Sequence, residues 1–143
     1  MKLFIAASYS SQVNYDTGEV FPEYKAWMEE TLTQLENDGH QVVCALREDG
    51  YRINDADPAS AFRLDYDSIA AAEGLVAFLS EKISAGVQTE IGIAVALKKR
   101  VIIAQKKGTK VEYYNNALER AGAATLTSYD SNEINSALLT KNS

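Results

Sequence analysis

The stretch from Ser84 to Ala94 contains residue types that could cleave a glycosidic bond. It reads Ser-Ala-Gly-Val-Gln-Thr-Glu-Ile-Gly-Ile-Ala, a Ser- and Gly-containing loop that leads from a buried strand into a helix. The free N–H groups and the dipole of such a helix N-terminus form an anion site. Glu90 falls near the first turn, where the dipole favours the ionised carboxylate and apolar neighbours exclude water, as a nucleophile requires. The alternative is an ordinary first-turn acid that complements the dipole.

Two further carboxylates, Asp65 and Asp67, lie in a helical segment that leads to the third predicted strand. A nucleophilic carboxylate and a second one that transfers protons are the groups used in glycosyl transfer through an oxocarbenium-like transition state. The two aspartates could equally belong to a solvated helix face beside Arg63. The residues alone leave both interpretations open.

The elements that must position these side chains follow from the hydrophobic pattern. Short apolar runs alternate with segments of helical period, which is typical of a parallel sheet covered by helices. The predicted strands are Leu3–Ala7, Gln41–Leu46, Leu75–Leu79, Val101–Gln105 and Ala124–Thr127. The predicted helices are Pro22–Asp38, a segment capped by Asp57 that ends near Ala72, Val87–Lys99, Lys110–Ala121 capped by Thr109, and a short one after Asp130 or Ser131.

This pattern predicts an α/β fold, a flavodoxin-like (Rossmann-like) three-layer sandwich with a five-stranded parallel sheet, in a single domain over residues 1–143. Ligands of such sheets bind outside the carboxyl ends of the strands. The loops of interest are therefore Ser8–Phe21, Arg47–Asp57, Ser80–Gly86 and Lys106–Thr109. Within the first of these, residues 10–21 could form a lid, a hairpin or a disordered loop.

The helix Val87–Lys99 is apolar most of the way round, so it must be covered on several sides. We therefore expect a homodimer, or a higher homo-oligomer, that forms through this region. Cys44 alternates within a predicted strand and is expected to be a buried small hydrophobic residue.

The composition narrows the classes of function. The formal net charge of −6 argues against a basic face for nucleic acid, although one phosphate can still be held by a helix N-terminus. One His and one Cys argue against a His/Cys zinc site or a Ser-His-Asp triad, so we expect no metal and no cofactor. No apolar run approaches the roughly 18–20 residues that span a bilayer, which predicts a cytoplasmic protein without a membrane partner.

Several motifs together resemble the nucleoside 2-deoxyribosyltransferase superfamily, and most closely its (deoxy)nucleoside 5′-monophosphate N-glycosidases. They are Asp65-Tyr66-Asp67-Ser68-Ile69, the strand Gly74–Leu79, Ser84-Ala85-Gly86-Val87, Glu90-Ile91-Gly92-Ile93-Ala94 and Lys99-Arg100-Val101-Ile102. The resemblance covers about Asp65–Ile103. The family often has Tyr in the first strand and Gly with a nearby Arg after it, whereas this chain has Phe4, Ala7 and no Arg before Arg47.

The resemblance implies that Glu90 is the nucleophile that attacks C1′ of the sugar and carries a covalent glycosyl intermediate. It implies that Asp65 binds the substrate and helps to protonate the leaving base, with Asp67 in that place if the register shifts by two. It also implies that substrate binding involves Ser8 and Tyr9, which follow the first strand. Tyr9 could stack on the base or be an ordinary surface tyrosine.

Ser84 falls where phosphate-binding members of the family have Ser and the transferases tend to have an acid. A hydroxyl can donate to a 5′-phosphate that a carboxylate would repel. We therefore expect Ser84 and the N–H groups of Gly86 and Val87 to hold the phosphate, with a cation from Lys82 or from a partner subunit.

The expected function is hydrolysis of the N-glycosidic bond of a nucleoside or deoxynucleoside 5′-monophosphate, a small-molecule substrate. One alternative is a nucleoside 2-deoxyribosyltransferase that exchanges bases. The alternative from another class is a nucleotide sensor that binds without catalysis.

Overall fold

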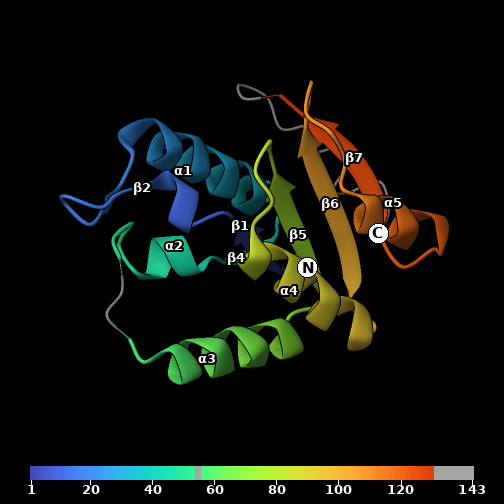
Figure 1. The fold of residues 1–143 in the computed structure, drawn as a ribbon. Helices are drawn as coiled ribbons and strands as arrows, with labels where there is room; N and C mark the ends of the chain where they lie inside the picture. The colour runs from blue at the N-terminus through green and yellow to red at the C-terminus, as the bar shows by residue number, and fades with distance from the viewer. Residues whose placement is uncertain (54–55, 131–143) are drawn as a thin grey trace.

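The computed structural model of the chain describes residues 1–53 and 56–130. Its centre is a sheet of five parallel strands in the order β4-β1-β5-β6-β7 (Figure 1). The strands are β1 (Lys2–Ala7), β4 (Gln41–Val43), β5 (Gly74–Leu79), β6 (Arg100–Lys106) and β7 (Thr125–Tyr129). The chain passes from β1 to β4 on one side of it and then returns to β5 on the other side, so the strand order reverses at β1. This arrangement confirms the predicted flavodoxin-like sheet and places its switch point between β1 and β5.

The strands are continuous apolar runs because both faces of the sheet are covered. Every residue of β5 is buried, and so are the inner residues of β1 and β6. The carboxyl ends of β1 and β5 run side by side, with Ala7 opposite Phe78. Side chains that follow β1 and β5 are therefore brought to the same edge of the sheet.

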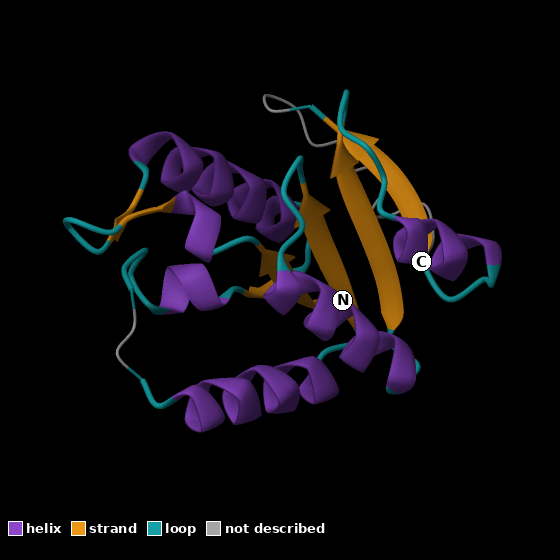
Figure 2. Cartoon of the chain, in the orientation of Figure 1, coloured by secondary structure: helices purple, strands orange, loops and turns teal. Residues whose placement is uncertain are grey.

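Helices form a layer on each face of the sheet (Figure 2). The helix α1 (Pro22–Asn37) covers one face. The helices α3 (Pro58–Ala71), α4 (Ala85–Ala96) and α5 (Tyr113–Arg120) lie on the other. The predicted three-layer sandwich is thus confirmed.

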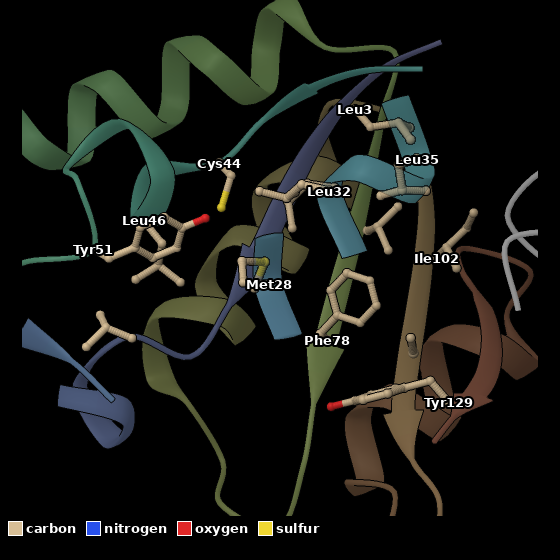
Figure 3. Packing of buried hydrophobic residues seen from close by; sticks show 14 of the residues in the cluster. Leu3, Met28, Leu32, Leu35, Cys44, Leu46, Tyr51, Phe78, Ile102 and Tyr129 are labelled. Carbon is tan, nitrogen blue, oxygen red and sulfur yellow. The ribbon is translucent and has the colours of Figure 1, made fainter. Parts of the chain in front are cut away.

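The core on the α1 side follows from the spacing of the apolar residues in that helix. Met28, Leu32 and Leu35 recur at helical spacing and are fully buried. Figure 3 shows these three side chains facing Phe78 of β5 and Ile102 of β6. Burying such side chains stabilises the fold by about 1.5–3 kcal/mol each relative to leaving them exposed.

The predicted strand Gln41–Leu46 is too long. Strand β4 ends at Val43, and residues 45–48 form the short helix α2 (Ala45–Glu48). β4 is an edge strand whose pairing with β1 ends at Val43, so the chain is free to turn. The alternating burial of Cys44 and Leu46, with a less buried residue between them, resembles a strand in sequence although a helical turn produces it.

The predicted helix Lys110–Ala121 begins too early. Helix α5 starts at Tyr113, and its N-cap is Glu112, whose carboxylate accepts from the backbone N–H of Tyr114 at 2.6 Å. Thr109 does not cap it because its hydroxyl donates to the carbonyl of Lys106 and accepts from the side chain of Gln105. Thr109 therefore closes the turn after β6.

The segment after β1 contains a hairpin, one of the three forms that the sequence left open. A 3₁₀ turn, η1 (Ser10–Gln12), leads into the antiparallel strands β2 (Val13–Asn14) and β3 (Glu19–Val20). The helix predicted after Asp130 or Ser131 lies outside the described residues. No helix in the described part of the chain is long and apolar enough to cross a membrane.

Candidate active site

A cavity of about 430 Å³ opens at the carboxyl end of β1, beside the switch point of the sheet. It collects side chains from the loop after β1, from α2, from α3 and from the start of α4. The residues that both line it and were singled out from the sequence are Tyr9, Asp65, Ser84, Gly86, Val87 and Glu90. The structure thus brings together residues that lie as far apart in the sequence as Tyr9 and Glu90.

The position of Glu90 follows from the two faces of α4. Val87, Ile91 and Ala94 are buried against the sheet at helical spacing. The adjacent face carries Gly86, Thr89, Glu90 and Ile93, and these residues line the cavity. The apolar stripe that fixes α4 on the sheet therefore also directs Glu90 into the cavity.

The N-terminus of α4 is capped and braced. Ser84 is the N-cap, and its hydroxyl oxygen accepts from the backbone N–H of Val87 at 3.3 Å. One turn further, the side-chain amides of Gln88 and Asn115 form two reciprocal hydrogen bonds of 3.1 Å. Asn115 is fully buried, so this amide pair joins α4 to α5 and holds the capped end in place.

Asp65 reaches the same cavity from α3. The one fully buried residue of α3 is Ile69, which lies one helical turn after Asp65 and anchors that face of the helix. Asp65 is half-buried, whereas Asp67 is exposed and lines neither this cavity nor the one that adjoins it. The structure therefore brings Asp65, and not Asp67, to Glu90.

Burial dominates the electrostatics of Glu90. Burial, together with the negative charge of Asp65, raises the pKa of Glu90 to about 8. The expectation that the helix dipole keeps this carboxylate ionised is wrong. Glu90 is the sixth residue of α4, and the dipole effect fades after the first turn. At neutral pH the carboxyl group of Glu90 therefore largely holds its proton.

Asp65 and Tyr9 are also perturbed. Partial burial and the charges of Asp49 and Glu48 raise the pKa of Asp65. Burial and the charge of Asp49 raise the pKa of Tyr9. The Tyr9 hydroxyl is enclosed and has no hydrogen-bond partner within the described parts of the chain. It is thus a donor without a protein partner at the wall of the cavity.

Two predicted residues lie elsewhere. Ser8 does not line the cavity, and its hydroxyl pairs with that of Ser11 at 2.6 Å. Lys82 lines a separate cavity beside α5. No Lys or Arg of the described segments lines the cavity that holds Glu90, so an anion there would rely on hydroxyl and N–H donors. The N–H of Val87, which was expected to hold the phosphate, instead donates to the Ser84 hydroxyl because Ser84 caps the helix.

Sequence reasoning missed part of the wall. Cys44, Phe62, Thr89 and Ile93 also line the cavity. Thr89 and Ile93 follow Gly86 at helical spacing, so the periodicity of α4 could have found them. Cys44 is buried, as expected, and burial raises the pKa of its thiol. It serves as an apolar wall.

The arrangement can carry out acid-base and nucleophilic chemistry on a neutral or anionic ligand. Two carboxyl groups with raised pKa values face one space, and a capped helix N-terminus stands beside them. Across residues 1–53 and 56–130, no cluster of three or more His, Cys, Asp or Glu side chains has the arrangement of a metal site.

The fold is that of an α/β protein with two carboxyl groups beside the switch point of its sheet, and the family that its sequence matches makes it an enzyme that acts on N-glycosyl compounds. The model of the nucleoside 2-deoxyribosyltransferase family matches residues 17–133. The chain belongs to this family, as the motifs around Asp65 and Glu90 indicated.

Solved structures share the fold. The CMP N-glycosidase BcmB of Clostridium botulinum has a TM-score of 0.66 and 23% identity, over 90% of this chain and 88% of that one. The protein BlsM has a TM-score of 0.71 and 22% identity, over 90% and 80%. A 2-deoxyribosyltransferase of Bacillus psychrosaccharolyticus has a TM-score of 0.60 and 15% identity, over 89% and 98%. No curated protein sequence matches the chain at a significant level.

Proposed function

We propose that this protein hydrolyses the N-glycosidic bond of a nucleoside or deoxynucleoside 5′-monophosphate through a covalent glycosyl intermediate on Glu90. The observation that carries the proposal is the meeting of Glu90, Asp65 and Ser84 in one cavity. Each of the three supplies one function that the reaction needs: a nucleophile, a proton donor and a hydroxyl for the phosphate.

The first step breaks the bond between C1′ and the base. The ionised carboxylate of Glu90 attacks C1′, and the electron pair of the C1′–N bond leaves with the base. Protonated Asp65 donates a proton to the departing base nitrogen, which gives the free base and a glycosyl ester on Glu90.

The second step releases the sugar. Asp65, now ionised, accepts a proton from a water molecule as that water attacks C1′ of the ester. The bond between C1′ and Glu90 breaks, and the products are a pentose 5-phosphate and the original carboxylate. A proton from the water thus replaces the one that Asp65 gave to the base in the first step.

The raised pKa values of Glu90 and Asp65 fit the proposed roles of nucleophile and proton donor. Two interacting acids that share one proton can place it on either partner. The reactive arrangement has the proton on Asp65 and the charge on Glu90. Burial is the larger cause of the raised pKa of Glu90, and the charge of Asp65 adds to it. Protonation of Asp65 removes this second cause and so makes ionisation of Glu90 easier.

The phosphate is assigned to the start of α4. The oxygen of Ser84 already accepts from Val87, so its hydroxyl proton remains for a phosphate oxygen. Gly86 is exposed and carries no side chain that would cover this end of the helix. A hydroxyl in place of an acid at this position favours a phosphorylated substrate over a free nucleoside. The structurally similar BcmB is an N-glycosidase of CMP, which is an activity of the same class.

The proposed assembly is a homodimer that covers the apolar surface beside the cavity. Phe62 and Leu64 of α3 are exposed by 52% and 61%. Phe62 and the half-buried Ile93 of α4 both line the cavity as well. A second copy seated on α3 and α4 would therefore bury this surface and close the site. Light scattering at several protein concentrations tests this, and a strictly monomeric chain would refute it.

The catalytic proposal is tested by incubating the protein with ribo- and deoxyribonucleoside monophosphates and measuring free base by chromatography. We expect base release by the native protein, loss of it in Glu90→Ala, and a pentose phosphate adduct on Glu90 in rapidly quenched samples. Full activity of Glu90→Ala would overturn the mechanism. Base exchange that requires an added second base would establish the transferase. Nucleotide binding without base release would indicate a sensor.

A further inference from the structure

A second cavity, of about 440 Å³, adjoins the catalytic one. The two share four lining residues, Tyr9, Ser10, Ala45 and Asp65. The second cavity continues from Asp65 between α2 and α3, away from Glu90, where Figure 1 shows these two helices facing each other. Its volume falls within the roughly 300–1,000 Å³ of small-molecule sites. A substrate held at Glu90 can therefore extend past Asp65 into this space.

The walls of this cavity suit a flat ring. Aromatic and aliphatic side chains form most of them: Phe4, Val13, Tyr15, Val43, Ile53 and Leu64. Three of these residues, Tyr15, Ile53 and Leu64, are exposed. Apolar faces on both sides of a planar heterocycle stabilise it by burial and by contact with aromatic rings.

The charged groups that line the second cavity within the described chain are all acids. Glu48 and Asp49 belong to the end of α2, and Asp65 faces them from α3. The charges of Asp49 and Glu48 raise the pKa of Asp65, which shows that the three groups interact across the cavity. Ionised carboxylates accept hydrogen bonds and cannot donate them.

Helix α2 is held firmly from the side opposite the cavity. Arg47 forms an ion pair with Glu36 of α1 at 2.7 Å, and its Nε lies 3.7 Å from Glu29 of the same helix. The hydroxyl of Tyr51 also donates to Glu29. These contacts fix the turn that carries Glu48 and Asp49, so the two acids form a wall of defined position.

We propose that this second cavity holds the nucleobase and that Glu48 and Asp49 select bases that carry an exocyclic amino group. The inference rests on the proposed function, because it places the scissile bond at Glu90 and the base beyond Asp65. An amino group turned toward Glu48 and Asp49 donates to a carboxylate. An oxo group at the same ring position places two acceptors together, and their repulsion with loss of the hydrogen bond disfavours that base.

Matched substrates that differ in a single amino group test this selection. CMP is compared with UMP, and AMP with IMP, in both ribo and deoxy forms, because each pair exchanges an amino group for an oxo group at one ring position. We expect kcat/KM to be at least about tenfold higher for the amino member of each pair, since one hydrogen bond to a charged group contributes about 1.5–3 kcal/mol. The Glu48→Gln and Asp49→Asn variants should lower this ratio, because their amides can also donate to an oxo group.

The control variant is Asp67→Asn, which removes an exposed carboxylate of α3 that lines neither cavity. It should leave the amino-to-oxo ratio unchanged. Equal or reversed ratios in the native protein, or ratios that Glu48→Gln and Asp49→Asn do not alter, would overturn the selection while leaving the glycosidase proposal intact.

If no nucleotide is cleaved, the glycosidase proposal fails and the selection is decided by binding. Calorimetry of the Glu90→Gln variant with the same pairs then measures the two dissociation constants directly. About tenfold tighter binding of CMP than of UMP would support the assignment, and equal binding of both members of each pair would refute it.

Discussion

Asp65 and Glu90 line one cavity, and the negative charge of Asp65 acts with burial to raise the pKa of Glu90 to about 8. The pKa of Asp65 is itself raised, by partial burial and by the charges of Asp49 and Glu48. Two acids so coupled titrate as a pair. The pair therefore holds at least one proton at neutral pH, which a proton donor to the leaving base requires.

Base release should have a bell-shaped dependence on pH. The reactive state carries one proton on the pair, so kcat/KM should fall as the pair loses that proton near pH 8. It should also fall at low pH, where both groups are protonated and the nucleophile is lost. The measurement is kcat/KM for one nucleotide from about pH 4 to about pH 10.

The Asp65→Asn variant separates the two limbs of this profile. Without the proton donor, kcat should fall by about 10²–10⁴. The remaining activity should rise to a plateau with pH and show no alkaline decline. Its rising limb should reflect Glu90 alone, with a pKa below that of the native protein because the charge of Asp65 is gone. An unchanged bell-shaped profile in Asp65→Asn would contradict the assignment.

The titration of Glu90 should also appear in the stability of the protein. Its pKa is about 8 in the folded state and near 4.5 in the unfolded chain, so the folded state binds more protons between these values. The stabilising contribution is therefore complete below about pH 4.5 and is lost as pH rises toward 8, by on the order of a few kcal/mol.

The Glu90→Gln variant removes this dependence. Its free energy of unfolding, measured in urea, should decline less between pH 5 and pH 8 than that of the native protein, since Gln has no proton to lose. The matched control is Glu23→Gln, an exposed acid in the first turn of α1. Its pH dependence should follow that of the native protein, and parallel curves for all three proteins would refute the raised pKa.

Ser84 combines a structural role with a proposed binding role, and two variants distinguish them. Ser84→Ala removes the cap on Val87 and should cost about 1 kcal/mol of stability. Ser84→Asp keeps a good cap but places a negative charge beside the phosphate. The melting temperature of Ser84→Asp should therefore be close to that of the native protein. The ratio of kcat/KM for nucleotide over nucleoside should fall most in the Asp variant, and an unaltered ratio would remove Ser84 from the phosphate site.

Tyr9→Phe tests the unpaired hydroxyl in the wall between the two cavities. Because that hydroxyl is enclosed without a partner among the described residues, its removal should leave the stability unchanged or raise it slightly. If the hydroxyl donates to the substrate, KM should rise while the fold is retained. A loss of stability with an unchanged KM would show that the hydroxyl has a structural partner instead.

The sequence predicted the sheet well because both its faces are covered. β5 and β6 are uninterrupted apolar runs, and their helices have clear period, so the elements and the class of fold could be read directly. The strand order could not be predicted, because a hydrophobic pattern shows which residues are buried but not which strands pair with each other. It is the order that brings the loop after β1 to Glu90.

The sequence predicted which carboxylates belong to the site but not how their pKa values are shifted. Glu90 and Asp65 were named from their motifs, and the structure places both in one cavity. The depth at which Glu90 is buried cannot be read from its motif, and burial outweighs the helix dipole in setting the pKa of Glu90. Glu48 and Asp49 lie in the predicted ligand loop Arg47–Asp57, but the pattern does not indicate which of its residues line a cavity, because the turn that presents them depends on contacts with α1.

Replacement by Ala should change the stability of the protein in opposite directions at two glycines, Gly74 and Gly92. At Gly74, in the first position of β5, a Cβ would lie 3.1 Å from the carbonyl oxygen of Arg100 and 3.2 Å from a methyl group of Leu3. The backbone of β6 cannot withdraw without disturbing the centre of the sheet. Gly74→Ala should therefore destabilise the protein by about 1–3 kcal/mol.

Gly92 is the matched control, because it lies within α4 with open space where a Cβ would stand. Gly92→Ala should stabilise the chain by about 0.5–1 kcal/mol, since Ala loses less backbone entropy in a helix. Urea unfolding of both variants gives the two values. If a second copy packs closely over this face of α4, the added methyl group would instead weaken assembly, which light scattering of the same samples would detect. An equal loss of stability in both monomeric variants would contradict the close contact assigned to Gly74.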